Sequence, residues 1–376
     1  MHESKRDAPR LLFVPQGGRG GTGEYARCLT LAHAARARWP GARVAFATKA
    51  TAARFDDDDY PRYVLPAEPR GGAVERVVWA TAPDLVVFNN TGKGPDLAAA
   101  RRSGARVVYV GSVPRYRRRG LRRELLRQMD ALWIFPSDDS ESRLSPKEED
   151  TWRRSGRPPL QFFASIFAPS LPERAAKLRA RLGVEGDGYL LFVPGGGGWK
   201  PRGRFCSDLF VEAAALAARA SGLPALVVLG PLHRTTPDAP EGVRVLGYLE
   251  QPELMDLVAG ARVVATGGGG LLNQALSLGA ACVAAPLHRG DQPHRIQEGE
   301  ARGWLVGVEP EPDAIGAAAA SLAGDPARRA TLGARLAEAG PRNELDRCMD
   351  HLAPLVDAGA RPCPLWLRPV RPLRRR

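Results

Sequence analysis

The sequence predicts an α/β protein whose strands form parallel sheets. Short apolar segments alternate with helical stretches along most of the 376 residues, as in sheets that helices cover on both faces. A Pro-rich and aromatic passage at 156–172 interrupts this alternation once, and the alternation then resumes. The length also exceeds the roughly 250–300 residues that one hydrophobic core usually supports. We therefore expect two doubly wound, Rossmann-like domains that face a central cleft, with the passage as the crossover between them.

The first domain is expected to span residues 1–165. Its predicted strands are the apolar runs at 11–15, 43–48, 84–88, 106–110 and 131–135, and a periodic run at 25–39 predicts its first helix. The second domain is expected at 166–345, with strands at 189–193, 225–229, 243–246, 262–265 and 281–285, a helix at 208–221 and closing helices at 314–339. Residues 346–376 form a basic Pro/Arg tail, which we expect to be poorly ordered or to pack back on the first domain.

The composition excludes several classes of protein. The 44% of hydrophobic and 25% of charged residues are not those of a disordered or fibrous chain. No apolar run approaches the roughly 18–20 residues that span a bilayer, and residues 1–10 do not lead into a secretory signal, so we expect a cytoplasmic protein. The five Cys and six His are dispersed, which argues against a disulfide framework or a zinc site.

The net charge of +13 is concentrated in two places, at 115–127 and at 368–376. The stretch 115–127 carries seven Arg and one Glu. Such a stretch attracts an anionic acceptor or the headgroups of an anionic membrane, at about 1 kcal/mol per basic residue, and peripheral contact at the inner face of the membrane is one expectation. A solvated helix face and the Arg-rich usage of a GC-rich genome are the alternatives. We expect no nucleic-acid partner, because no nucleic-acid-binding module is present.

Three glycine-rich loops, at 17–23, 194–200 and 266–274, each follow a predicted strand. Glycines let backbone N–H groups approach an anion at a helix N-terminus, whose dipole favours negative charge. The first loop matches G-x-G-x-x-G, but no carboxylate follows the second strand until Asp56, which argues against NAD. The second loop lacks the G-K-[ST] of a P-loop. Its glycines Gly196, Gly197 and Gly198 suit a close approach to a phosphate or sugar, or else only a tight strand–helix turn.

The third loop is followed, at the end of the next strand, by Asp291 and Gln292. In doubly wound sheets, ligands lie outside the carboxyl ends of the strands. The loop amides and the helix N-terminus are suited to a diphosphate, and the Asp-Gln pair to sugar hydroxyls. Without the glycine loop, the pair would indicate only a turn.

The passage 243–304 resembles the nucleotide-sugar half of GT-B glycosyltransferases. Its matching segments are Leu-Gly-Tyr-Leu at 246–249, the four glycines at 267–270, Gln-Ala-Leu-Ser-Leu-Gly at 274–279 and Gly-Asp-Gln at 290–292. The resemblance implies that Tyr248 and Leu249 flank the nucleobase. It also implies that Asp291 and Gln292 hold the donor sugar and that Gln274, where the family often has Glu, contacts the ribose. The implied diphosphate contacts are Gly268, Gly269, Gly270, Leu271 and Leu272.

The first half is similar to the UDP-N-acetylglucosamine transferase that completes the peptidoglycan lipid precursor. The similarity lies at 20–23, 83–87 and 91–95, and the segments 20–23 and 27–32 also resemble a nucleotide-sugar hydrolase of pseudaminic acid synthesis. In both relatives a His after the first loop is thought to handle a proton, whereas this chain has Glu24 there. We expect the following residues to face the acceptor: Gly21, Thr22, Gly23, Asn89, Asn90 and Arg115. The two Asn could instead cap the local turn.

These features predict a glycosyltransferase that uses a nucleotide-diphosphate sugar, UDP-linked by resemblance. Backbone amides and a helix dipole stabilise a leaving diphosphate without metal, and few carboxylates lie at the loops, so we expect metal independence and no cofactor beyond the sugar nucleotide. Glu24 is the candidate base for the acceptor hydroxyl, or else a first-turn carboxylate that favours the helix dipole. The resemblance implies inversion at the anomeric carbon. A nucleotide-sugar hydrolase and a non-catalytic sugar-nucleotide-binding protein are the alternatives, and the acceptor is not identified.

Overall fold

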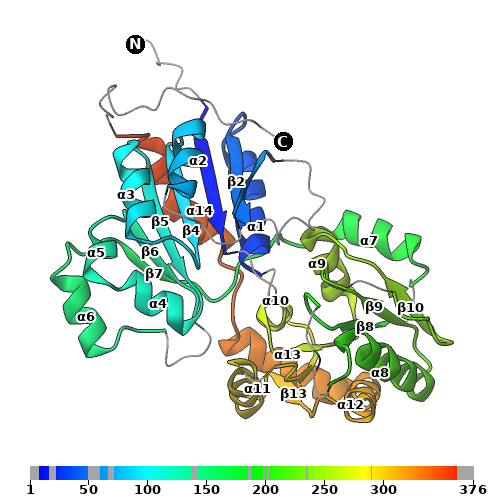
Figure 1. Cartoon of the computed structure of the whole chain (residues 1–376). Helices are drawn as coiled ribbons and strands as arrows, with labels where there is room; N and C mark the ends of the chain where they lie inside the picture. The colour runs from blue at the N-terminus through cyan, green and yellow to red at the C-terminus, as the bar shows by residue number, and fades with distance from the viewer. Residues whose placement is uncertain are drawn as a thin grey trace. The chain divides into compact units, whose positions relative to one another are not determined.

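The computed structural model describes residues 8–16, 23–49, 60–66, 72–136, 142–184, 188–197, 200, 203–233, 236–288 and 290–361. The chain divides into two compact units. The first contains residues 1–18, 24–163 and 345–376, and the second contains 19–23 and 164–344. Each unit is built around its own parallel sheet (Figure 1).

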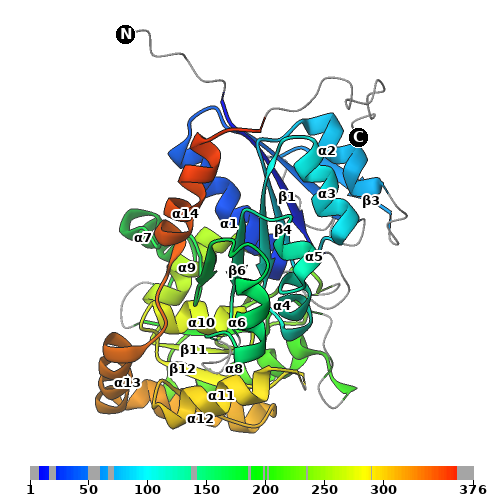
Figure 2. The ribbon, with the colours of Figure 1, turned by 90° about the vertical axis from the view of Figure 1, so that its left-hand side faces the viewer.

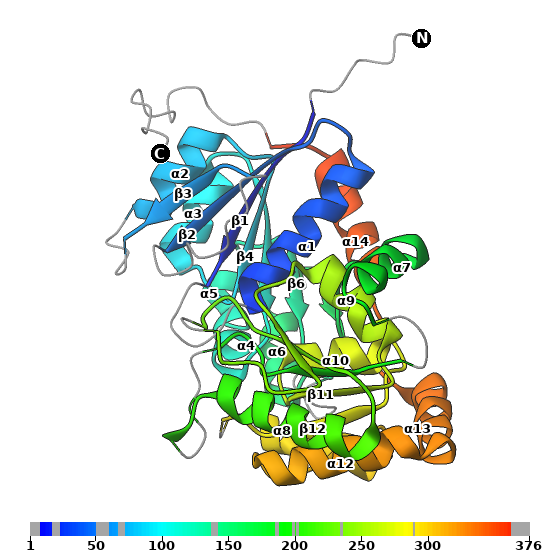
Figure 3. The ribbon, with the colours of Figure 1, turned by 90° about the vertical axis from the view of Figure 1, so that its right-hand side faces the viewer.

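The first unit has a seven-stranded sheet in the order β3-β2-β1-β4-β5-β6-β7. Its strands are β1 (Arg10–Pro15), β2 (Arg43–Lys49), β3 (Arg62–Leu65), β4 (Leu85–Asn89), β5 (Arg106–Gly111), β6 (Ala131–Ile134) and β7 (Leu160–Phe162). Its helices are α1 (Gly23–Arg38), α2 (Ala73–Thr81), α3 (Gly94–Arg102), α4 (Pro114–Gly120), α5 (Arg123–Leu126), α6 (Pro146–Arg153) and α14 (Leu345–Asp357). Figure 3 shows α2 and α3 on one side of this sheet and α1 and α14 on the other.

Burial on both faces explains the uniformly apolar strands of the first sheet. Leu12 and Val14 of β1 belong to the core beneath α2 and α3. Phe13, on the opposite face, stacks on Phe46 with ring centroids 5.5 Å apart, and Tyr25 of α1 lies 5.2 Å from the same ring. The aromatic contact therefore anchors α1 on its face of the sheet.

The second unit has a six-stranded sheet in the order β10-β9-β8-β11-β12-β13. Its strands are β8 (Leu190–Val193), β9 (Ala225–Val228), β10 (Val243–Leu246), β11 (Val263–Gly267), β12 (Cys282–Ala285) and β13 (Leu305–Gly307). Its helices are α7 (Pro172–Arg181), α8 (Cys206–Ser221), α9 (Gln251–Gly260), α10 (Gly270–Ser277), α11 (Gln292–Ala301), α12 (Pro312–Gly324) and α13 (Pro326–Ala339). Two apolar clusters lie on the two faces, one beneath α8 and α12 and the other beneath α9 and α10 (Figure 3).

The strand order reverses between β8 and β11 in this sheet, and between β1 and β4 in the first. In β8 and β11, Val193 pairs with Thr266, whose Oγ1 donates a buried hydrogen bond to the Val193 carbonyl at 2.9 Å. In β1 and β4, Pro15 pairs with Asn89. Doubly wound sheets bind ligands at such reversals. One glycine-rich loop follows β1, and another follows β8.

The predicted doubly wound α/β class is confirmed, with local differences. Strand β7 lies inside the passage 156–172, which was expected to be only a crossover, and it forms the edge of the first sheet. The edge strands β3 and β13 were also missed.

The first part of the expected tail forms α14, a helix that belongs to the first unit, as the second of the two expectations for the tail had it. The helix buries Leu345, Cys348, Leu352 and Val356 at helical spacing, and it lies beside α1 (Figure 2). Arg38 of α1 pairs with Asp350 of α14 at 2.8 Å. Residues 362–376 lie outside the described residues. Across the described part of the chain, no helix combines the length and the hydropathy needed to cross a membrane.

Candidate functional site

The third glycine loop turns the carboxyl end of β11 into α10. Gly269 is the N-cap of α10 and is extended, with φ −84° and ψ −166°. The N–H of Leu272 donates to the Gly269 carbonyl at 3.1 Å, and the Leu272 side chain is fully buried. Leu272 is therefore a core residue with no group left for a diphosphate, contrary to expectation. The N–H groups of Gly270 and Leu271 lie in the first turn of α10, where a helix offers no acceptor for them.

Packing explains some glycines of this loop and not others. A Cβ on Gly268 would lie 2.8 Å from Gln292 Cβ, and one on Gly267 would lie 2.7 Å from a methyl group of Leu287. These two positions need glycine because α11 and the β12 end approach closely. A Cβ on Gly270 would meet nothing within 4 Å, so the space above the first turn of α10 is open.

Arg295 of α11, which the sequence analysis missed, connects the loop to Asp291. Its Nη2 donates to Asp291 Oδ2 at 2.5 Å, and its Nη1 donates to the Gly268 carbonyl. Asp291 keeps a third of its side chain exposed, whereas Arg295 is mostly buried. The i, i+4 spacing from Asp291 is the only sequence signal that could have indicated this pair.

Gln292 lies beneath the loop and is almost fully buried. Its Oε1 accepts a hydrogen bond from the Leu287 N–H at 2.8 Å, so the carbonyl end of its side chain holds the β12–α11 turn. Its Nε2 lies 3.9 Å from the position of a Cβ on Gly269. Only this amide group is placed to take part in a ligand site at the loop.

The other predicted donor residues are less closely associated with the loop. Tyr248 follows β10 and leaves 43% of its surface exposed, and Leu249 packs partly against the core beneath α9 and α10. Gln274 Nε2 donates to the Ile166 carbonyl at 3.5 Å. An exposed aromatic ring at the carboxyl edge of the sheet is compatible with base stacking.

The second glycine loop has a structural reason for its glycines. Gly197 has a φ of +91°, and a Cβ there would lie 2.9 Å from the His233 backbone N. The Gly196 carbonyl accepts a hydrogen bond from the Leu232 N–H at 2.9 Å. Gly198 lies outside the described residues. Gly196 and Gly197 therefore pack against the segment after β9.

His233, which the sequence did not indicate, lies beside this loop. Its Nε2 is buried and has no hydrogen-bond partner among the described residues. Burial lowers the pKa of His233, which favours the neutral ring, and the charge of Asp208 opposes this shift.

In the first unit, Glu24 lies in the first turn of α1, and Asn90 holds its carboxylate. Asn90 Nδ2 donates to Glu24 Oε1 at 2.8 Å and to Ser112 Oγ at 2.6 Å, while its Oδ1 accepts from the Ser112 N–H at 2.8 Å. Asn90 has a left-handed φ of +52°, a conformation that Asn tolerates better than most residues. The second oxygen of Glu24, Oε2, accepts no hydrogen bond from a described residue.

Asn89 is the second fully buried amide of this cluster. Its Nδ2 donates to the Glu24 carbonyl at 3.0 Å, and its Oδ1 accepts from Arg27 Nη1 at 3.2 Å. Both Asn were expected to contact an acceptor, but their amide groups are engaged inside the unit and are not exposed. They act here as positioning residues for Glu24 and α1. Gly23 is exposed, and Gly21 and Thr22 lie outside the described residues.

The basic stretch 115–127 is not one continuous solvated face. Arg117 is buried and forms a bidentate pair with Glu148, with N–O distances of 3.1 and 2.9 Å. Its Nη2 also donates to the Arg143 carbonyl at 2.6 Å. Arg115 is exposed and lies 5.5 Å from the centre of the Tyr116 ring. The remaining exposed arginines of the stretch are Arg118, Arg122, Arg123 and Arg127.

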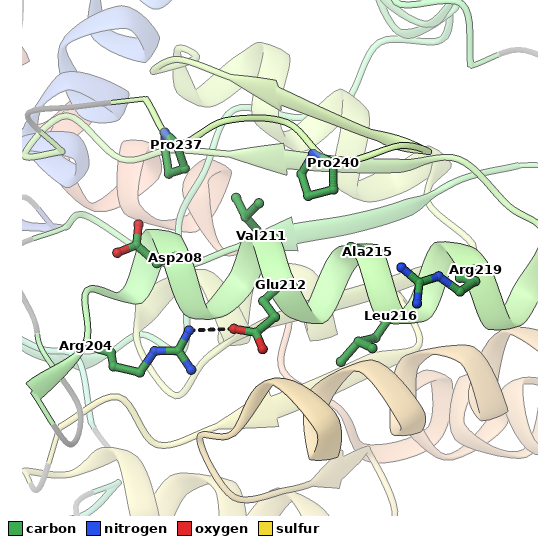
Figure 4. Close-up of a pocket in the computed structure, with 9 residues that line it drawn as sticks. All are labelled: Arg204, Asp208, Val211, Glu212, Ala215, Leu216, Arg219, Pro237 and Pro240. Atoms are coloured by element: carbon green, nitrogen blue, oxygen red, sulfur yellow. Dashed lines mark hydrogen bonds and ion pairs between the residues drawn. The ribbon is translucent and has the colours of Figure 1, made fainter.

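A hollow of about 430 Å³ lies along the exposed face of α8 (Figure 4). Val211 and Ala215 contribute apolar surface to it, and the Arg204–Glu212 ion pair, with an N–O distance of 2.5 Å, lies at one end. None of the predicted donor residues lines it. Across the described residues, no group of three or more His, Cys, Asp or Glu is arranged to hold a metal ion.

No protein-family model matches the sequence, and no curated protein does. Solved structures do match. The spinosyn forosaminyltransferase SpnP superposes with a TM-score of 0.57 at 18% identity, over 92% of this chain and 100% of that one. MurG of Acinetobacter baumannii superposes with a TM-score of 0.56 at 14% identity, over 92% of this chain and 99% of that one. The chain has the GT-B fold.

The GT-B fold confirms the resemblance noted in the sequence at the level of architecture. The same fold is shared by a putative UDP-N-acetylglucosamine 2-epimerase from Listeria monocytogenes, with a TM-score of 0.53 at 12% identity over 95% of this chain and 99% of that one. At such identities the likeness is one of fold. The activity must therefore be argued from the site residues.

Proposed function

We propose that this GT-B protein transfers a sugar from a nucleotide-diphosphate sugar, UDP-linked, to an acceptor hydroxyl. The observation that carries the proposal is the first turn of α10. There, the N–H groups of Gly270 and Leu271 have no intrahelical acceptor, the space above Gly270 is open, and the turn follows the strand reversal between β8 and β11. A diphosphate matches this turn in charge and in hydrogen-bonding capacity.

In this proposal the second unit stabilises the leaving group without a metal. The positive end of α10 and its free amides interact with the negative charge that develops on the diphosphate as the glycosidic bond breaks. Asp291 accepts hydrogen bonds from hydroxyls of the donor sugar, because Arg295 fixes only one of its oxygens. The exposed ring of Tyr248 is the candidate for stacking on the nucleobase.

Glu24 removes the proton of the acceptor hydroxyl in this proposal. Asn90 fixes Oε1, which leaves Oε2 to accept a hydrogen bond from the acceptor. The attacking oxygen then displaces the diphosphate in a single step, so the configuration at the anomeric carbon inverts.

A matched pair of variants at Gly270 tests the donor site. Gly270→Pro removes one N–H at the first helical position, which proline tolerates, and Gly269 is already extended as a residue before proline must be. Gly270→Ala adds a Cβ into open space and keeps the N–H. Calorimetry with UDP should show about tenfold weaker binding for Gly270→Pro than for Gly270→Ala.

The same titration with dTDP, GDP and NAD identifies the nucleotide class. Binding of NAD alone, or equal UDP affinity in both Gly270 variants, would remove the proposed donor site. Release of free sugar from a bound sugar nucleotide without any acceptor would instead favour a hydrolase.

We propose in addition that the exposed arginines of 115–127 contact an anionic membrane at its inner face. Arg115, Arg118 and Arg122 are exposed on or beside α4. Co-sedimentation with liposomes should require anionic lipid and should fall as salt rises. Equal binding to neutral liposomes would contradict the electrostatic contact.

A further inference from the structure

Arg27 is a partly buried arginine on α1, three residues after Glu24. Its guanidinium carbon lies 4.2 Å from the centre of the Phe135 ring, and Nη1 donates to Asn89 Oδ1 at 3.2 Å. Burial lowers the pKa of Arg27, and the nearby Glu24 charge opposes this shift. The guanidinium stays protonated at neutral pH. The aromatic face and the Asn89 amide therefore hold a desolvated positive charge in one place.

Arg27 forms no ion pair with a described residue, unlike Arg117 and Arg295, which lie at or near the other candidate sites. Arg117 pairs with Glu148 and Arg295 pairs with Asp291, each at less than 3 Å. Arg27 has one hydrogen bond, to a neutral oxygen, although a guanidinium carries five N–H donors. Removing a charge from water without a partner is costly, so its position calls for a partner from outside the described chain.

We propose that Arg27 binds a negatively charged group of a substrate, a phosphate or a carboxylate. The planar fork of a guanidinium matches both groups with two parallel hydrogen bonds. One helical turn separates Arg27 from Glu24, so the bound anion lies within one substrate length of the proposed base. The identification of that substrate rests on the proposed function. The anion belongs either to the acceptor or to the diphosphate of the donor.

The test compares Arg27→Met with Arg36→Met. Arg36 lies on the same helix with its guanidinium 5.0 Å from the centre of the Tyr60 ring, but it is exposed. Thermal unfolding is followed while inorganic phosphate replaces chloride at constant ionic strength. The wild type and Arg36→Met should gain stability with a saturable dependence on phosphate. Arg27→Met should need about tenfold more phosphate for the same gain.

Without phosphate, Arg27→Met should change the unfolding temperature little, because loss of the hydrogen bond to Asn89 Oδ1 and removal of a partly desolvated charge oppose each other. If the variant does not fold, Arg27→Lys replaces it. Lysine keeps the charge but loses the fork, so phosphate binding should still weaken. Equal phosphate dependence in the wild type and the Arg27 variant, or no phosphate effect in the wild type, would overturn the proposal.

UDP titration then distinguishes the two sources of the anion. If Arg27→Met binds UDP as the wild type does, the anion belongs to the acceptor. If the binding of UDP weakens together with the binding of phosphate, the anion is the donor diphosphate. Gly270→Pro separates this inference from the proposed function. Loss of the phosphate effect in Gly270→Pro but not in Arg27→Met refutes a role for Arg27. The reverse result supports Arg27, and the UDP affinity of Gly270→Pro then tests the donor loop separately.

Discussion

Replacing Arg295 by methionine tests how the proposed donor site is held in shape. The side chain donates hydrogen bonds to the Asp291 carboxylate and to the Gly268 carbonyl. A hydrogen bond to a charged group contributes about 1.5–3 kcal/mol. Asp291 is one-third exposed, so water replaces part of what is lost. We expect Arg295→Met to lower the free energy of unfolding by about 2 kcal/mol.

Arg295→Met should weaken the binding of the donor sugar more than the binding of the nucleotide. Asp291 would no longer be held in one rotamer, and the Gly268 carbonyl would lose its connection to α11. Calorimetry should show about tenfold weaker binding of the sugar nucleotide, with a smaller change for UDP, and urea unfolding gives the stability. Arg302→Met is the matched control, because Arg302 forms an i, i+4 pair with Glu298 at 2.8 Å on the same helix. The reasoning would be refuted if Arg295→Met bound the sugar nucleotide with wild-type affinity. It would also be refuted if Arg295→Met and Arg302→Met lost equal affinity for the sugar nucleotide.

Three further predictions concern the base, the second glycine loop and the buried thiols. Glu24→Gln should abolish turnover and leave UDP affinity unchanged; full activity would remove Glu24 from the mechanism. Gly197→Ala should destabilise the protein by about 1–3 kcal/mol more than Gly203→Ala in urea unfolding. Both positions have a positive φ, but only Gly197 lies against backbone, and equal losses would contradict this explanation. Burial raises the pKa of Cys28 and of Cys282 to about 12, from about 8.5 in an unfolded chain. Below pH 8.5 the protein has the full stability that comes from burying these thiols in the neutral form, and it loses that stability as the pH rises towards 12. The unfolding temperature should therefore fall over this pH range, and it should fall less in Cys282→Ala than in the wild type.

The central strands were predictable because burial on both faces leaves a strong sequence signal. Every residue of β4 (Leu85–Asn89) and β11 (Val263–Gly267) is buried, and such runs are apolar almost throughout. The edge strands were missed for the opposite reason. Strand β7 (Leu160–Phe162) has three residues, none fully buried, so neither length nor hydropathy distinguishes it from a loop. Helix α14 has a regular apolar spacing, which the Pro/Arg composition of the tail obscured.

The parts of the candidate site that the backbone forms could be located from the sequence. The parts that side chains form could not. A glycine loop between a strand and a helix is local, so the position of the loop at Gly268, Gly269 and Gly270 between β11 and α10 could be located from the sequence. The role of Leu272 could not, because its burial depends on α10 packing against the sheet. Arg295 and His233 depend on which elements the sheet brings together. The two Asn of the first unit look polar in sequence, but residues of α1 and Ser112 after β5 engage both amides.

The sequence by itself determined the class of fold and the position of the glycine loops at the carboxyl edges of the sheets, because these follow from local hydrophobic periodicity and from backbone conformation. The tertiary structure decided the state of each charged group. Of the arginines in and near the proposed sites, Arg117 is neutralised by Glu148 and Arg295 holds Asp291, whereas among the described residues Arg27 has one hydrogen-bond partner, the neutral Asn89. Charge is read directly from the sequence, but desolvation and pairing depend on residues far apart in the chain, and only packing brings those together.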